Sequence, residues 1–195
     1  MARQKEFDRT KVLDKALDVF WCRGYEATSM QDLVAHMGIN RQSLYDTFGD
    51  KHALYLAALD RYAEIEGPKF VAPLAQAQNE TVKAALGRVF QAVVDEAVAG
   101  GQQRGCFMVN AAIECLPHDQ DIAMRVFSSV NGLETAFVAA LKRAQANNEL
   151  SAAQDVHAIA RFLVNAVHGL RVLTKTTTDR QVLQDVIDVT LRVLD

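Results

Sequence analysis

Three consecutive polar side chains, Arg41, Gln42 and Ser43, have the chemistry needed to read the edges of DNA bases. Arginine can donate two hydrogen bonds to guanine, glutamine can pair with adenine through two hydrogen bonds, and serine can donate or accept. They follow Asn40, a residue type that favours the position just before a helix. Side chains at the start of a helix reach base edges when that helix enters the major groove. These three residues are therefore the first candidates for a nucleic-acid contact.

Two short helical segments around a tight turn must position these side chains. The apolar period predicts one helix up to Met37, opened by Thr28 and Gln31 as a capping box, and a second helix from 41 to 48. Only the residues 38–40, glycine, isoleucine and asparagine, separate the two helices. Short helices joined in this way are typical of a helix-turn-helix.

Residues 28–51, TSMQDLVAHMGINRQSLYDTFGDK, resemble the N-terminal motif of the tetracycline-repressor (TetR) family of bacterial transcription factors. The positions that match the motif are Thr28, Leu33, Gly38, Ile39, Asn40, Ser43, Leu44, Tyr45, Phe48, Asp50 and Lys51. Two residues depart from it: Val34 replaces the usual alanine, and Thr47 stands where many members have histidine. The resemblance implies a double-stranded DNA operator whose phosphates are held by Thr28, Tyr45 and Lys51. It also implies a helical C-terminal part that binds a small-molecule effector.

The helical period continues to the end of the chain and predicts an all-α fold of about nine helices. A fourth helix, from Lys51 to Glu66, is expected to stop before Gly67 and Pro68, with a boundary region at 67–73. The later helices are expected at about 81–98, 106–115, 119–146, 152–174 and 179–194, the last two opened by the pairs Ser151 with Gln154 and Thr178 with Gln181. We predict a DNA-binding domain over 1–52, connected by helix 51–66 to an effector-binding and dimerisation domain over 53–195.

A homodimer is predicted from two apolar stripes on the last two helices, which together would form a four-helix seam. The stripes consist of Val156, Ile159, Ala160, Leu163, Val167 and Leu170, followed by Val182, Leu183, Val186, Ile187 and Leu194. Gly169 would allow close approach of the helices.

Polar and aromatic residues set in apolar helices are candidates for lining an effector pocket. They are Asn110, Phe127, Asn131, Phe162 and Asn165. A buried amide has to find hydrogen-bond partners, so each asparagine either closes a structural hydrogen bond or lines a wet cavity. Cys106 follows a glycine-rich stretch, next to Arg104 at the expected start of a helix, a setting that lowers a thiol pKa. A redox or electrophile sensor that uses Cys106 is therefore an alternative function.

The composition excludes several other classes of protein. The chain has 195 residues, 50% of them apolar, and a formal net charge of -3, with equal numbers of basic and acidic residues in 1–52, so any DNA contact must come from local clustering. Its three cysteines are widely spaced, which indicates neither a disulfide framework nor a metal site. No apolar run reaches the roughly 18 residues that span a bilayer, and we expect a cytoplasmic protein with no membrane partner.

These patterns favour a one-component regulator, a repressor that leaves its operator when a small molecule binds. Nothing in the chain has the spacing of a catalytic, metal or cofactor site, so we expect neither an enzyme nor a bound cofactor or metal. Other possibilities are an activator, an enzyme or carrier that merely resembles the motif, and a helix-turn-helix used as an interaction module. The basic residues near the N-terminus, Arg3, Lys5, Arg9 and Lys11, form either an arm that touches DNA or a solvated tail.

Overall fold

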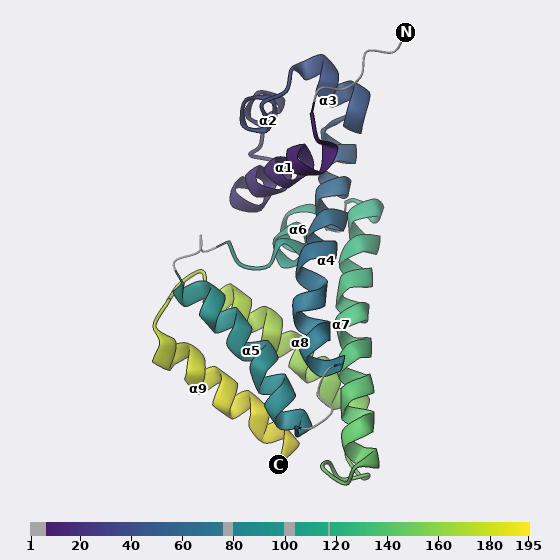
Figure 1. Cartoon of the computed structure of the whole chain (residues 1–195), viewed down its shortest axis with the longest axis vertical. Coiled ribbons are helices and arrows are strands. Elements are labelled where there is room, and N and C mark those ends of the chain that lie inside the picture. The colour runs from purple at the N-terminus through teal and green to yellow at the C-terminus, as the bar shows by residue number, and fades with distance from the viewer. Residues whose placement is uncertain (1–6, 76–79, 100–103, 117) are drawn as a thin grey trace. The chain divides into compact units, whose positions relative to one another are not determined.

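The computed structural model describes residues 7–75, 80–99, 104–116 and 118–195, and these form nine α-helices and a terminal 3-10 turn (Figure 1). The helices are α1 (Arg9–Arg23), α2 (Met30–Met37), α3 (Arg41–Phe48), α4 (Lys51–Ala75), α5 (Val82–Val98), α6 (Phe107–Cys115), α7 (Gln120–Ala146), α8 (Val156–Leu173) and α9 (Arg180–Leu191), followed by the 3-10 turn Arg192–Leu194. This part of the chain contains no strand, and the all-α prediction is confirmed. Arg3 and Lys5 of the predicted arm lie outside the described residues.

The chain divides into two compact units by its internal contacts. Unit one comprises Met1–Ile65 and Phe107–Val126, and unit two comprises Glu66–Cys106 and Phe127–Asp195. Helices α4 and α7 each contain residues of both units. Unit one therefore contains α6 and the start of α7 in addition to the helix-turn-helix. The functional division at residue 52 stays a prediction.

An aromatic cluster forms the centre of unit one. Phe20 from α1, Tyr55 from α4 and Phe107 from α6 are fully buried, and their rings meet edge to face. The ring centroids are 4.9 Å apart for Phe20 and Tyr55 and 5.4 Å apart for Tyr55 and Phe107. Trp21 and Tyr62 extend the cluster with centroids 5.0 Å apart. Edge-to-face contacts of this kind add to the free energy gained by burial, so three helices far apart in sequence share one core.

The core of unit two is built mainly from α5, α8 and α9, which run side by side (Figure 1). Most of the stripe predicted to form a dimer seam is buried in this core: Val156, Ile159, Ala160, Leu163, Val167 and Leu170 of α8, and Leu183, Ile187 and Leu194. Those residues already pack within their own chain, so their assignment to a seam between subunits is wrong. The apolar period identified the buried side of each helix but not the element that covers it.

Helix α8 is also the one helix in the described part of the chain that is long and apolar enough to cross a membrane by length and composition. Its apolar side is buried against α5 and α9, which is the ordinary arrangement of a core helix.

Helix α4 is longer than the sequence predicts. We expected it to end at Glu66, before Gly67 and Pro68, with a boundary at 67–73, but it continues to Ala75. Proline removes one N–H donor from the helical ladder and crowds the preceding turn, which is why its presence predicts an end. Here tertiary contacts overcome that cost.

The contacts that hold the second half of α4 are spaced four residues apart. Glu66 is buried and its carboxylate lies 3.0 Å from the Arg171 guanidinium, while Phe70 and Leu74 pack on the core of unit two. Residues four apart lie on one face of a helix, so three successive turns of α4 are held on the same side. This face keeps the segment helical in spite of its two prolines.

The predicted capping boxes are also wrong in detail. Helix α2 is capped by Ser29 and Asp32, which form a capping box, instead of by Thr28 and Gln31. Helices α8 and α9 begin after Asp155 and Asp179, whose carboxylates accept backbone N–H groups of the first turn, and not at Ser151 or Thr178. Each observed cap is a short polar side chain directly before the first helical residue, where it can reach the free N–H groups.

Replacing Gly24 by alanine should destabilise unit one. Gly24 ends α1 with φ +82°, a conformation that costs other residues about 1 to 2 kcal/mol, and an added Cβ would lie 2.7 Å from Glu114 Oε2. We expect the free energy of unfolding to fall by about 1 to 3 kcal/mol, measured by urea denaturation with Trp21 fluorescence. Gly67→Ala is the control: Gly67 is helical with open space around it, so this change should stabilise by about 0.5 to 1 kcal/mol. Equal decreases in the free energy of unfolding of the two variants would contradict the view that the backbone conformation and close contact of Gly24 require a glycine.

Candidate nucleic-acid interface

The turn between α2 and α3 has the geometry of a helix-turn-helix. Gly38 ends α2 in the left-handed conformation, with φ 72° and ψ 28°, and Asn40 caps α3 by accepting a 2.8 Å hydrogen bond from the Ser43 N–H. Leu33 of α2 and Leu44 of α3 are fully buried in the interior of unit one. Because these apolar residues fix one side of α3, its opposite side is held toward solvent.

The exposed side of α3 carries two pairs of polar side chains, each pair one helical turn apart. The Arg41 guanidinium donates to the Tyr45 hydroxyl at 3.3 Å and lies 5.7 Å from the centre of the Tyr45 ring. Gln42 donates to the carboxylate of Asp46 at 2.8 Å. Of the predicted base readers, Arg41 and Gln42 are exposed on this side of α3, and so is Tyr45, which was predicted to hold a phosphate. Asp46 is exposed on the same side and was not among the residues predicted to contact DNA.

Ser43 and Thr47 are only partly exposed. The Ser43 N–H is engaged by the Asn40 cap, and the Thr47 hydroxyl donates to the Ser43 carbonyl oxygen at 2.7 Å. The Thr47 side chain is therefore turned back onto its own helix. Thr47, which stands where many family members have histidine, therefore offers little polar surface for a contact with DNA.

Thr28 is fully buried, which differs from the expected phosphate contact. Its hydroxyl donates to the Gly24 carbonyl oxygen at 2.6 Å, and its backbone N–H donates to the Tyr25 carbonyl oxygen at 3.3 Å. Thr28 therefore braces the connection between α1 and α2. The exposed residue at the start of α2 is Ser29, and its hydroxyl and N–H groups together with Arg23 lower the pKa of Asp32.

Lys51 begins α4, and its ammonium group lies 4.3 Å from the centre of the Tyr25 ring. A cation over a ring face is attracted by the ring quadrupole, so this contact holds the lysine near the start of α4. Burial, followed by the charges of Glu26 and Asp50, raises the pKa of the Tyr25 phenol. Asp50 caps the helix by accepting from the Ala53 N–H at 2.8 Å. Lys51 thus stays near the surface beside a helix N-terminus, a place suited to a phosphate contact.

A carboxylate from α6 closes the turn between α1 and α2. Glu114 accepts hydrogen bonds from the backbone N–H groups of Tyr25, at 2.9 Å, and Glu26, at 2.8 Å. Glu114 stands in the last turn of α6, where the helix dipole disfavours a negative charge. Its position is explained by the two N–H groups, which belong to the turn between α1 and α2 and need an acceptor outside the helices. No pattern in the sequence indicates this contact, because 88 residues separate Glu26 from Glu114.

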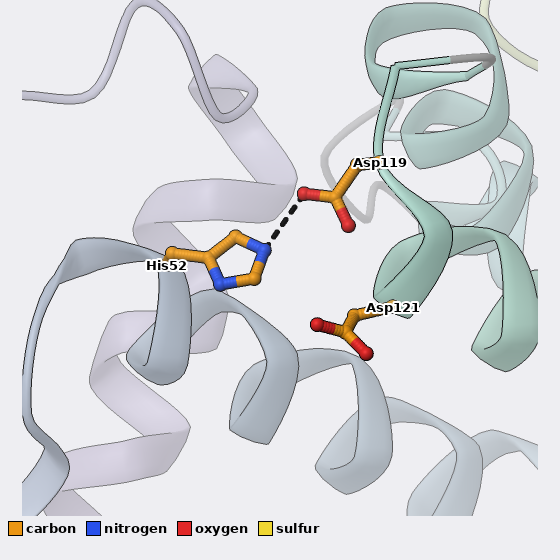
Figure 2. Close-up of side chains that lie close together, drawn as sticks. All are labelled: His52, Asp119 and Asp121. Carbon is orange, nitrogen blue, oxygen red and sulfur yellow. Dashed lines mark hydrogen bonds and ion pairs between the residues drawn. The ribbon is translucent and has the colours of Figure 1, made fainter.

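A second long-range contact joins the starts of α4 and α7. The His52 ring Nε2 lies 2.7 Å from Asp119 Oδ2, and Asp121 is close to both, as Figure 2 shows. The Ile122 N–H, followed by His52, lowers the pKa of Asp119. In the described part of the chain, these three residues are a group of ligand type close enough together, within 4.8 Å, to hold a metal ion. Both aspartates also suit the N-terminus of α7, where the helix dipole favours negative charge.

The five residues predicted to line an effector pocket are not among the residues that line the two cavities described below. In the described chain Phe127, Asn131, Phe162 and Asn165 are exposed and Asn110 is half-buried. Two cavities in the described part of unit two are formed by other residues. One, of about 420 Å³, is lined by Leu74, Ala75, Glu80, Val82, Ala85, Ala140, Arg143, Ala144, Asn147 and Glu149. The other, of about 180 Å³, is lined by Lys69, Phe70, Ala92, Val93, Glu96 and Arg171. A ligand role for the five residues stays a prediction.

Cys106, just before α6, and Cys115, at the end of α6, are both buried. Cys106 directly precedes α6 and is 5% exposed, and the preceding residue, Gly105, is covered by the side chain of Lys175. Cys115 is also buried, and desolvation together with the charge of Glu114 raises its thiol pKa to about 11. Reactive cysteines are usually partly exposed, so this burial argues against the thiol-sensing alternative.

A helix-turn-helix whose second helix exposes arginine, glutamine and tyrosine, in an all-α chain, defines the protein as a transcriptional regulator of the helix-turn-helix class. Residues 12–58 match the family model for bacterial regulatory proteins of the tetR family, and residues 82–190 match the tetracyclin repressor-like C-terminal domain. The chain belongs to the TetR family, as the motif at 28–51 indicated.

Relatives of similar length support this assignment. The HTH-type transcriptional regulator YezE of Bacillus subtilis (strain 168) is 40% identical over the whole of both chains. The HTH-type transcriptional repressor ComR of Escherichia coli (strain K12) is 34% identical over 97% of this chain and 90% of its own. Among solved structures, a cysteine mutant of the TetR family regulator CifR, complexed with 26-bp operator DNA, has a TM-score of 0.88 and 28% identity, with both chains fully covered.

Replacing Glu114 by glutamine should weaken the turn between α1 and α2. The amide keeps one acceptor but turns an N–H group toward the Tyr25 or Glu26 N–H, so one backbone donor loses its partner. We expect the free energy of unfolding to fall by about 1 to 3 kcal/mol and the two backbone amides to exchange hydrogen faster. Glu26→Gln removes the same charge from an exposed side chain in this turn and should leave both quantities unchanged. If the two variants behave alike, charge and not the hydrogen bonds explains the effect.

Proposed function

We propose that this regulator is a repressor that binds a pseudo-palindromic operator and is released from it by a small-molecule effector. The observation that carries the proposal is the exposed face of α3, where Arg41, Gln42 and Tyr45 are held outward by the buried side of the same helix. The relative ComR is named a repressor, and the CifR structure contains operator DNA. We place the protein in the cytoplasm, where such regulators meet DNA.

In this proposal Arg41, Gln42 and Ser43 contact base edges, while Tyr45 and Lys51 bind phosphates. Arginine and glutamine reach bases through pairs of hydrogen bonds, whereas a lysine beside a helix N-terminus adds charge and no sequence information. For Thr28, whose hydroxyl faces inward, the proposed role is to shape the N-terminus of α2, whose exposed end lies at Ser29. The N–H groups of that helix end are suited to a phosphate oxygen.

Unit two, with its two cavities, is the proposed site of effector binding. Helix α4 contains Lys51 at one end and the buried Glu66 and Leu74 in its second half. A ligand that repacks unit two can therefore act on the same helix that begins next to the recognition helix. A 100-fold loss of operator affinity requires a coupling free energy of about 2.7 kcal/mol, and the same factor then lowers effector affinity on DNA.

We further propose that two chains associate through the exposed sides of α8 and α9. The buried stripe of these helices packs in the core of its own chain. The exposed apolar residues of the two helices are Phe162, Val172, Val182 and Val189. Exposed apolar side chains grouped on neighbouring helices are typical of an association surface. A two-fold pair of α8 and α9 would form a four-helix contact, and its symmetry would match a pseudo-palindromic operator.

Operator binding is tested by selecting DNA fragments with the purified full chain, followed by footprinting. We expect two half-sites about 34 to 36 Å apart, or a multiple of that spacing. Arg41→Ala should lose about 1 to 3 kcal/mol of discrimination at one base pair in each half-site, because it removes a base contact. Lys51→Ala should weaken binding to all sequences and reduce the salt slope by about one, because it removes a phosphate contact. Losses from Arg41→Ala that are the same for every sequence would contradict its role as a base reader.

The same operator, titrated with a metabolite library, tests release by an effector. A compound that lowers operator affinity in the wild type and less so in Asn165→Leu would support the predicted ligand role of Asn165. Failure of every compound to change DNA binding would contradict the repressor-release mechanism.

Association is tested by sedimentation of the wild type and of Phe162→Glu. The wild type should sediment as a dimer at micromolar concentration, and the variant should dissociate because it places a charge within the apolar contact. Ile113→Glu is the control, since Ile113 is 77% exposed on α6, away from α8 and α9 in sequence, and should leave the dimer intact. A wild-type monomer would contradict the proposal.

A further inference from the structure

The exposed face of α3 contains a negative charge that the proposed contacts do not use. In the sequence of this helix, RQSLYDTF, Asp46 is the one acidic residue. It is exposed and lies one turn after Gln42, whose side-chain nitrogen donates to Asp46 Oδ1 at 2.8 Å. A carboxylate on a helix that approaches DNA is repelled by the phosphates, so its place needs an explanation.

The hydrogen bond fixes how Gln42 is presented. A carboxylate can only accept hydrogen bonds, so the amide nitrogen of Gln42 must be the atom that faces Asp46. This leaves the Gln42 carbonyl oxygen and its second N–H pointing away from Asp46. One acceptor and one donor are the two groups that glutamine needs to pair with N6 and N7 of adenine. Asp46 therefore holds the Gln42 amide in the orientation that pairing with adenine requires.

The chemistry of the major groove limits what the carboxylate itself can contact. The donors exposed there are the amino groups of cytosine and adenine, whereas guanine O6 and thymine O4 are acceptors that repel a carboxylate. Arg41, on the same side of α3, contacts the Tyr45 hydroxyl and ring. An aspartate in this position is thus stabilised by a base with an amino group and destabilised by the other bases.

We propose that Gln42 and Asp46 read DNA as one unit: Gln42 pairs with an adenine, and Asp46 accepts a hydrogen bond from the amino group of an adjacent cytosine. This inference rests on the proposed function, in which α3 enters the major groove. It makes Asp46 a specificity-determining residue that acts against guanine and thymine at one position of each half-site. It also makes Asp46 a positioning residue for Gln42.

The test compares the wild type, Asp46→Ala, Gln42→Ala and the double variant on the selected operator and on all four bases at each half-site position. The wild type should prefer cytosine over thymine at one position by about 5- to 150-fold, the range of a good base contact. Asp46→Ala should lose this preference, weaken the preference for the adjacent adenine, and bind unrelated DNA more tightly because one negative charge is gone. The double variant should lose no more adenine preference than Gln42→Ala alone.

Two controls separate base reading from charge. Asp188→Ala removes a carboxylate from an equivalent pair on α9, where Gln184 donates to Asp188 at 2.8 Å, and should leave every base preference unchanged. An operator in which the cytosine is replaced by 2-pyrimidinone lacks only the amino group that Asp46 would contact. This operator should bind the wild type more weakly than the cytosine operator, though not more weakly than the thymine operator, in which O4 also repels the carboxylate, and should lose no affinity for Asp46→Ala.

Two results would overturn the inference in distinguishable ways. If Asp46→Ala binds all sequences more tightly but keeps every base preference, Asp46 acts through its charge alone, and the proposed operator binding still stands. If the wild type selects no operator, the proposed function fails, and the reading unit fails with it. Circular dichroism and Trp21 fluorescence of each variant, unchanged from the wild type, establish that a lost preference is not a loss of fold.

Discussion

The hydrogen bonds between the Glu114 carboxylate and the backbone of Tyr25 and Glu26 are the constraint on which the arrangement of unit one depends. Tyr25 and Glu26 lie outside the helices, so their N–H groups have no helical carbonyl as acceptor, and a buried N–H without a partner costs about 1 to 3 kcal/mol. Here one carboxylate satisfies two of them. The same carboxylate occupies the space above Gly24, so the glycine and the glutamate require each other. Through these contacts α6, which begins at Phe107, belongs to the same unit as the helix-turn-helix, whose second helix ends at Phe48.

Unit two depends on a different kind of interaction, a buried ion pair between Glu66 and Arg171. Both residues are 5% exposed, their charged groups are 3.0 Å apart, and the guanidinium lies 4.7 Å from the centre of the Phe70 ring. Removing two charges from water costs several kcal/mol per ion, and their attraction offsets this cost only when the geometry is good. Such a pair therefore contributes little to the net free energy of unfolding. Its main effect is on how the helices pack, because it joins one particular turn of α4 to one particular turn of α8.

The exposed side of α3 and the cavities of unit two differ in how far apart in the sequence their residues lie. On α3 the polar side chains are four residues apart, so local helix geometry alone brings Arg41 to Tyr45 and Gln42 to Asp46. The cavities of unit two are lined by residues from several helices, and no spacing along the chain identifies them. For this reason the exposed polar residues of α3 were predictable in large part, whereas the five candidate pocket residues were chosen by the polarity of single positions.

The sequence by itself determined the helices, the helix-turn-helix and the family, because an apolar period of 3.6 residues, glycines in left-handed turns and helix caps are local properties. Even there, the caps at Ser29, Asp155 and Asp179 differed from expectation, because several short polar side chains near each helix start are able to serve as the cap. The extension of α4 to Ala75 differed because it depends on tertiary contacts. Only the tertiary structure decided that the stripes of α8 and α9 pack inward, that Thr28 is buried, that Glu114 reaches the turn after α1, and that Asp119 reaches the start of α4. The physical reason is that a pattern of burial shows that a face is covered, whereas the identity of its partner depends on contacts between residues tens of positions apart.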